Sequence, residues 1–171
     1  MIPFASQRGG GQDLATHVQN AYDNEIAEVV HIRGAVADDL HGAFKEWEIQ
    51  ADALTRCDKY LYSLSVNPDP AQGPLTRDQY MDYVKRVEEA MGLNQQPRAI
   101  VFHTKEGREH CHVVWSRIDA EQRRAVHLAF DRDKLMRVTR AFARDHGLML
   151  QRGYEKSRQI GQESLYEQVQ T

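Results

Sequence analysis

Alternating apolar and polar residues predict several β-strands along the chain. The clearest lies at residues 59–66, where aromatic and aliphatic side chains alternate with serines. Residues 2–7, 26–33 and 125–128 carry shorter or less regular versions of a strand pattern. With the two strands of a central hairpin, described below, these segments predict about six strands.

Apolar residues spaced three or four apart predict four helices between these strands. The pattern places the helices at residues 13–23, 39–51, 76–92 and 131–147. Because helices separate most of the strands while the central pair forms a hairpin, we expect an α/β fold of the α+β sandwich type. Its core is a mainly antiparallel sheet of about five to six strands, mixed with crossovers, with the helices packed on it.

A hairpin in the middle of the chain carries the most distinctive chemistry. Apolar residues 99–102 lead into His103, six polar residues follow, and a second alternating run begins at His110. Since residues two apart on a strand share a face, His110 and His112 point the same way, and a six-residue loop can place His103 opposite them. Three imidazoles would then converge as ligands for a divalent metal. Alternatively, they are ordinary hydrogen-bonded residues, and a one-residue slip in register would separate them.

Composition favours a single soluble domain. The chain has 171 residues, of which 41% are hydrophobic and 27% charged. No long apolar stretch or signal sequence is present, so we expect a cytoplasmic protein without membrane insertion. The net charge of −3 excludes a uniformly basic nucleic-acid coat, whereas the arginines from Arg117 onward leave room for a local basic groove.

The last part of the chain differs in character from the rest. Residues 151–171 are polar, and their only large anchors are two tyrosines and a leucine. We expect residues 1–150 to form the domain and residues 151–171 to be a polar extension, the start of a region truncated from a longer protein.

The histidine motif resembles that of a known family. His103, a six-residue spacer and His110-Cys111-His112 before aliphatic residues match the third motif of the conjugative relaxases, or mobilisation nucleases, of the HUH endonuclease superfamily. The resemblance spans residues 62–147 and is greatest to the branch that includes the nicking enzymes of T-DNA borders. Ser65 matches the family's serine motif. The N-terminal glycine run and the helix that bears Tyr22 resemble its first motif more loosely.

The resemblance implies metal-dependent DNA chemistry. Relaxases nick one strand at an origin of transfer of a plasmid or other element, and a tyrosine hydroxyl becomes bonded to the 5′ phosphate, so the strand can later be rejoined. The resemblance implies a divalent metal on the three histidines, with Mn or Mg in function and Zn or Ni in crystals. Its implied partners are single-stranded DNA at the origin, accessory relaxosome proteins and a type IV secretion coupling protein. Export with the DNA to a recipient cell would follow.

Several residues are candidates for the remaining roles. Tyr22 is the expected nucleophile, because it follows the glycine run by eleven residues and has polar neighbours; the alternative is a ring packed on the sheet. Tyr60 and Tyr62 compete with it, and strand alternation predicts that one of them is buried and the other exposed. Ser65 is a DNA-backbone contact by resemblance, or an ordinary turn serine.

Two departures from the family pattern leave the acid–base group open. Lys105 stands where many relatives have an acidic residue, and Trp115-Ser116 stands where many have Asn after the strand. The acid–base candidates are Glu106, Glu109 and Asp23. Stacking rings for DNA could come from Trp47 or Trp115, and a basic track from Arg117 and the arginines after it, although core packing is the favoured role for Trp47.

Two other functions remain open from the sequence. One is a rolling-circle replication initiator or a transposase of the same superfamily, and the helix between the serine motif and the histidines favours the relaxase over these. The other is a metal- or DNA-binding protein without catalysis, which the departures at Lys105 and Ser116 would favour if they mark a decayed site.

Overall fold

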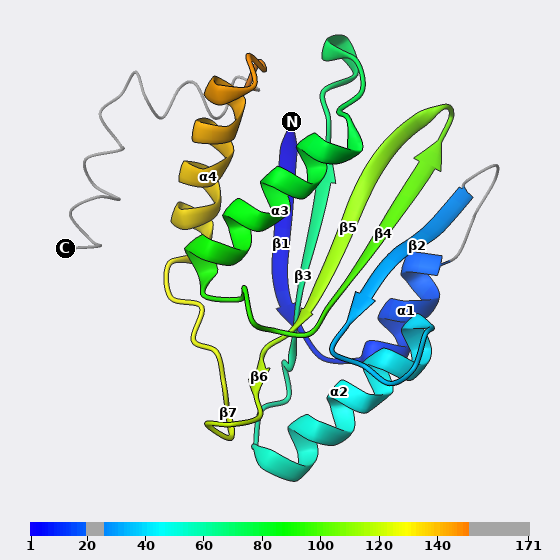
Figure 1. Cartoon of the computed structure of the whole chain (residues 1–171), viewed down its shortest axis with the longest axis vertical. Coiled ribbons are helices and arrows are strands. Elements are labelled where there is room, and N and C mark those ends of the chain that lie inside the picture. The colour runs from blue at the N-terminus through cyan, green and yellow to red at the C-terminus, as the bar shows by residue number, and fades with distance from the viewer. Residues whose placement is uncertain (20–25, 151–171) are drawn as a thin grey trace.

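The computed structural model describes residues 1–19 and 26–150 and centres on a five-stranded sheet (Figure 1). Its spatial order is β1-β3-β5-β4-β2. The strands are β1 (Ile2–Arg8), β2 (Ile26–Arg33), β3 (Leu61–Asn67), β4 (Arg98–Lys105) and β5 (Arg108–Ser116). Every pair of neighbouring strands in this sheet runs antiparallel. The expected α+β architecture is therefore confirmed.

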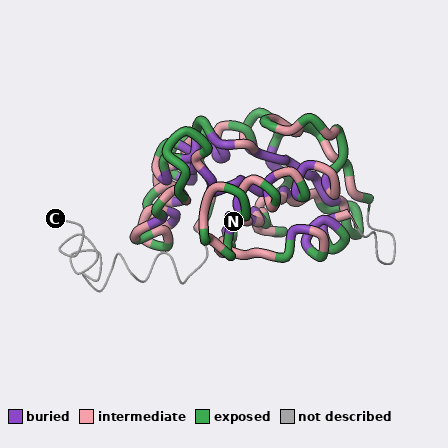
Figure 2. Tube along the Cα trace, turned by 90° about the horizontal axis from the view of Figure 1, so that it is seen from below, coloured by how far each residue is buried: buried purple, intermediate pink, exposed green. Residues whose placement is uncertain are grey.

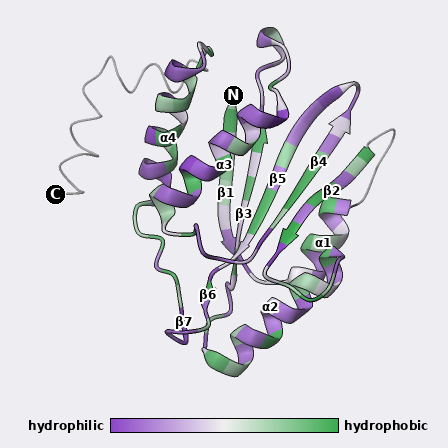
Figure 3. Ribbon diagram, in the orientation of Figure 1, coloured by the Kyte–Doolittle hydropathy of each residue, from purple (hydrophilic) through white to green (hydrophobic). Residues whose placement is uncertain are grey.

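Four α-helices cover the two faces of this sheet within the described part of the chain. They are α1 (Gly11–Gln19), α2 (Leu40–Leu54), α3 (Arg77–Met91) and α4 (Asp131–Asp145). One hydrophobic core contains residues of α3 and α4, and a second contains residues of α1 and α2. Buried residues accordingly run through the interior in Figure 2, and hydrophobic residues recur along the central strands in Figure 3.

Local signals in the sequence set most helix ends. Asp39 caps α2, where its carboxylate accepts a hydrogen bond from the Gly42 amide at 3.2 Å. Thr76 and Gln79 form a reciprocal capping box at the start of α3, and Gly92 ends that helix in the left-handed conformation. By contrast, α1 begins at Gly11, two residues before the predicted start, and the predicted end of this helix lies outside the described residues.

The expectation that one of Tyr60 and Tyr62 is exposed is wrong. Both are buried, with 4% and 0% of their surface exposed. The Tyr62 hydroxyl donates to Asp131 at 3.0 Å on the α4 side, and the Tyr60 hydroxyl donates to Glu48 at 3.1 Å on the α2 side. Residues two apart on a strand share a face, so alternation gives no reason to separate these two tyrosines. Tyr60 lies just before β3 and belongs to the core with α1 and α2, whereas Tyr62 lies within β3 and belongs to the core with α3 and α4. Helices cover both faces of the sheet, so neither ring is left in solvent.

The turn of the central hairpin is tighter than predicted. β4 continues to Lys105 and β5 begins at Arg108, so only Glu106 and Gly107 form the loop, with φ values of 51° and 75°. Two consecutive left-handed residues match the natural twist of the flanking strands. The expected six-residue loop is therefore wrong, since most of its polar residues extend the two strands.

The remaining elements are short. A 3₁₀ turn (Pro70–Gln72) follows β3, and β6 (Ile118–Asp119) pairs with β7 (Arg124–Ala125) in a separate two-stranded sheet. The last of these is shorter than the predicted strand at residues 125–128. None of the helices in the described ranges is both long and apolar enough to cross a lipid bilayer.

Candidate metal centre

Three histidines converge on the face of the sheet that also carries α1 and α2. His103 on β4 pairs directly with His110 on β5, and His112 follows two residues later on the same face. The ring centroid of His103 lies 5.2 Å from that of His110 and 4.5 Å from that of His112. The centroids of His110 and His112 are 5.2 Å apart. The predicted convergence of the three imidazoles is therefore confirmed.

The donor atoms are spaced for a single cation. One nitrogen from each of His103, His110 and His112 lies within 4.8 Å of the other two. A transition metal about 2.1 Å from each nitrogen holds the nitrogens roughly 3 to 4 Å apart, so small side-chain adjustments would complete the site. Three protein ligands leave coordination positions open, as catalytic sites require. The triad therefore fits a divalent metal, and the chemistry of its donors does not distinguish between ions.

A backbone contact orients the most buried of the three rings. His103 is only 5% exposed, and its Nε2 contacts the carbonyl oxygen of Val18 on α1. In the tautomer in which Nε2 donates to this carbonyl, Nδ1 holds the electron pair that a cation needs. Backbone carbonyls commonly fix metal-binding histidines in this way. This contact connects α1 to the metal site.

His112 is held in its neutral form. Burial lowers the pKa of His112 to about 3, and the nearby imidazoles of His103, His110 and His17 add to this effect. A neutral imidazole is the form that binds a metal. His17, which the sequence analysis did not single out, is exposed on α1 one residue before Val18. No local sequence signal marks it, because its proximity to the triad depends on how α1 packs.

The acidic candidates are not gathered at the triad. Glu109 alternates with His110 and so points to the opposite face, where its carboxylate accepts from Arg77 at 2.8 Å. Glu106 lies at the hairpin tip with 72% of its side chain exposed. Asp23 lies outside the described residues, as does Tyr22.

Ser65 lies beside the triad. It is the direct cross-strand neighbour of His112 on β3, and it is half-buried. Directly opposed residues share a face of the sheet, so its hydroxyl group belongs to the same surface as the three imidazoles. This placement is compatible with the predicted contact to a DNA backbone.

Arg117, Trp47 and Trp115, the other predicted DNA contacts, are buried away from the triad. Arg117 is 8% exposed and donates to the carbonyls of Lys59 at 2.7 Å and Val126 at 3.0 Å, beyond the end of β5 that is farther from the triad. Trp47 and Trp115 are 2% and 0% exposed, so neither ring offers a face for stacking. These residues stabilise the fold.

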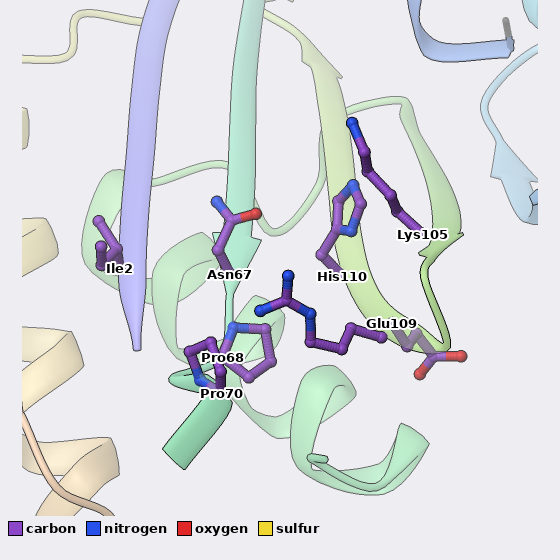
Figure 4. A pocket seen from close by; sticks show the side chains of 8 residues that line it. Ile2, Asn67, Pro68, Pro70, Lys105, Glu109 and His110 are labelled. Carbon is purple, nitrogen blue, oxygen red and sulfur yellow. The ribbon is translucent and has the colours of Figure 1, made fainter. Parts of the chain in front are cut away.

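A cavity beside His110 brings in two cations that the sequence analysis did not assign to the site. It has a volume of about 280 Å³, and Figure 4 shows Asn67, Lys105 and His110 among its lining residues. Arg108 also lines it, and the pairing of Lys105 with Arg108 places both on the triad's face. The prediction of a six-residue loop hid the shared face of Lys105 and Arg108, because side chains alternate between two faces in a strand but not in a loop.

Comparison with known proteins agrees with this geometry. The nuclease domain of MobA/VirD2-like relaxases matches residues 17–148, which is more than half of the chain and includes the whole hairpin. None of the curated proteins and none of the solved structures that were compared matches the chain.

Proposed function

This chain belongs to the relaxases with a MobA/VirD2-like nuclease domain, of the HUH superfamily, and we propose that it nicks and rejoins one DNA strand at an origin of transfer. The family acts as DNA endonucleases in mobilisation. The finer proposal is that Tyr22 is the nucleophile, that the three histidines hold a divalent metal, and that the reaction starts conjugative transfer of a plasmid or a similar element.

One observation carries this proposal. Residues on both sides of Tyr22 in the sequence are held next to His103. Val18, four residues before Tyr22, contacts the His103 ring through its carbonyl, and Ala27, five residues after it, pairs with His103 on the neighbouring strand. Four residues span at most about 14 Å. The chain length on either side therefore supports a phenol group within reach of the triad.

The proposed reaction is a transesterification. The Tyr22 oxygen attacks the phosphorus, the bond from phosphorus to the 3′ oxygen breaks, and that oxygen leaves with a proton as a free 3′ hydroxyl. The phenol loses its proton to a base, and Asp23 is one candidate. Because one ester is exchanged for another, the 3′ hydroxyl can attack the phosphotyrosine and restore the strand.

His103, His110 and His112 would hold the metal. When bound, a divalent cation in this position polarises the phosphate and offsets the charge that develops on its oxygens. The chain's own contribution is to keep three donors at fixed spacing through the hairpin register, and to keep His112 neutral through burial. Ser65, beside His112, is proposed to hydrogen-bond the DNA backbone next to the reacting phosphate.

The proposed partners follow from the family. The substrate is single-stranded DNA at the origin of transfer, and accessory relaxosome proteins and a type IV coupling protein complete the machinery. Residues 1–150 are proposed to form the nuclease domain and residues 151–171 to be a polar extension of it.

A nicking assay tests the proposal. A supercoiled plasmid that carries the cognate origin is incubated with the protein and Mn²⁺, and open-circular DNA is quantified with protein bound at the 5′ end. Tyr22→Phe is expected to abolish both products, whereas Tyr154→Phe, which removes a phenol outside the matched region, should leave them unchanged. Nicking that persists in Tyr22→Phe would contradict the proposed nucleophile, and metal-independent nicking would contradict the proposed centre.

A further inference from the structure

An exposed aromatic ring lies in line with the histidine triad. Phe4 on β1 pairs with Ser65 on β3, and Ser65 pairs with His112 on β5, so the three residues form one row across neighbouring strands. Directly paired residues share a face of the sheet, and neighbouring strands lie about 4.8 Å apart. Phe4 and His112 are therefore about 10 Å apart on the same face.

Phe4 is not part of either hydrophobic core. It is 66% exposed, although a phenylalanine on a strand is ordinarily buried. Its neighbours on this face are two serines, an asparagine and an isoleucine. Ser6 pairs with Ser63 on one side of the row, Ile2 pairs with Asn67 on the other, and all of these residues keep part of their surface exposed.

The helices of this face do not bury the row. In Figure 1, α1 lies beside β2 and α2 lies at the end of the sheet where β1 finishes, whereas Phe4 is near the opposite end of β1. The corresponding core contains residues of β3, β4 and β5 but none of β1. An aromatic ring is thus left open beside the triad.

The charge next to the row indicates which ligand the ring would meet. The cavity beside His110 is lined by Lys105 and Arg108, as well as by Asn67 and Ile2 from two of the three strands that carry the row. Glu106 approaches Arg108 only at 3.8 Å, with both side chains largely exposed. Cationic side chains beside an exposed ring form the usual platform for single-stranded nucleic acid, in which phosphates meet the cations and a base stacks on the ring.

We propose that Phe4 stacks on an unpaired base of the DNA strand close to the phosphate held at the triad, and so sets how that strand crosses the sheet. This inference rests on the proposed function, since it takes single-stranded DNA as the ligand. Phe4 acts by binding and positioning the strand and takes no part in bond breaking.

A binding assay that requires no cleavage tests this role. Tyr22→Phe protein, without metal, is titrated with two fluorescent probes of equal length: oligothymidylate, and an abasic deoxyribose-phosphate chain. A further Phe4→Ala substitution is expected to weaken oligothymidylate binding about tenfold, the effect of losing one stacked base, and to leave abasic binding unchanged. Phe4→Trp should retain the tighter binding of oligothymidylate. Phe4→Leu, which is apolar but has no π face, should lose it as Phe4→Ala does.

The control is Ile49→Ala, which removes a side chain of α2 that is 57% exposed. Thermal melting of each variant checks that it is folded. Phe4→Ala protein that binds oligothymidylate as well as its parent does, or that loses affinity equally for both probes, would overturn the stacking role. Because neither metal nor nicking enters the assay, a failure here is distinct from a failure of Tyr22 as nucleophile.

Discussion

His103 and His110 face each other across the central hairpin, with ring centroids 5.2 Å apart, and a two-residue turn holds them there. Only Lys105 and Arg108, the pair that closes the turn, and one further pair separate the histidines from Glu106 and Gly107. In a hairpin the turn fixes the register, and a slip of one residue would move His103 to the other face of β4. The conformation of two exposed residues thus supports the register on which the metal centre depends.

Gly107→Ala is expected to weaken both the fold and the metal site. Gly107 has φ of 75°, a conformation that costs an L-residue about 1 kcal/mol, and an added Cβ would meet no atom within 4 Å. The loss is therefore conformational. Urea unfolding should show a free energy lower by about 1 kcal/mol, with a parallel fall in Mn²⁺ affinity measured by calorimetry.

The matched change at the other turn position should act in the opposite direction. Glu106 has φ of 51°, and Asn adopts that conformation more readily. Glu106→Asn is expected to raise the unfolding free energy by a few tenths of a kcal/mol, about the gain from a better turn residue. A neutral Gly107→Ala together with a destabilising Glu106→Asn would show that the turn does not control the register.

Loss of any ligand should impair metal binding. His103→Ala, His110→Ala and His112→Ala are each expected to weaken Mn²⁺ binding at least about tenfold, because each removes one of three convergent donors. Calorimetric titration measures the effect. His127→Ala, which removes an exposed histidine outside the triad, is the control and should bind as the unsubstituted protein does. Equal affinities in all four variants would place the ion elsewhere.

Much of this site could be predicted from local sequence. The spacing of His110 and His112 determines that they share a face, and apolar residues on either side identify the strands. The prediction of six loop residues was wrong because polar residues 104–109 resemble a loop, and only cross-strand pairing shows that most of them are strand. The contributions of Lys105 and Arg108 to the cavity were hidden for the same reason.

The remaining differences concern tertiary packing. Periodicity identifies Tyr62 as facing one side of β3, but it does not reveal that helices cover both sides. Similarly, Arg117 has the charge expected of a DNA contact, yet its guanidinium donates to the backbone carbonyls of Lys59 and Val126, and no local pattern predicts these partners. The sequence shows Phe4 only as a residue of a predicted strand. Its exposure depends on which part of the sheet the helices cover, and local sequence does not reveal this.

The buried carboxylate of Glu88 is expected to be essential for stability. It is 4% exposed and accepts hydrogen bonds from Arg98, from Arg33 at 3.0 Å and from the Trp115 ring at 2.9 Å. Glu88→Ala would leave the buried Arg98 cation without this partner, at a cost of about 3 kcal/mol in unfolding free energy. Glu89→Ala, at the exposed neighbouring position, should cost less than about 0.5 kcal/mol. Similar urea midpoints for the two variants would argue against this role.

The contact between α3 and α4 should depend on pH through Asp82. A hydrogen bond with His146 at 2.7 Å, assisted by Arg86, lowers the pKa of Asp82 below its usual 3.8. A carboxyl whose pKa is depressed in the folded state stabilises that state above its unfolded pKa, and this contribution is lost as the pH falls through the folded value. Because the side chain is 38% exposed, the effect is expected to be about 0.5 kcal/mol.

Urea unfolding of the unsubstituted protein and of Asp82→Asn measures this contribution. The two unfolding free energies should differ at neutral pH and converge as the pH falls below 3.8. Asp78→Asn, on the same helix, is the control, since its carboxylate forms no ion pair with any residue in the described ranges 1–19 and 26–150. A difference for Asp82→Asn that persists unchanged in acid would show that the ionised carboxylate is not its source.

The location of the covalent bond tests the central claim most directly. Protein trapped on the nicked origin DNA is digested with a protease and a nuclease, and the peptide that carries the remaining nucleotide is identified by mass spectrometry. The account predicts that the nucleotide is attached to the Tyr22 oxygen, and that the adduct requires Mn²⁺ and all three histidines. Attachment to another residue, or an adduct that forms equally well in His112→Ala, would contradict it.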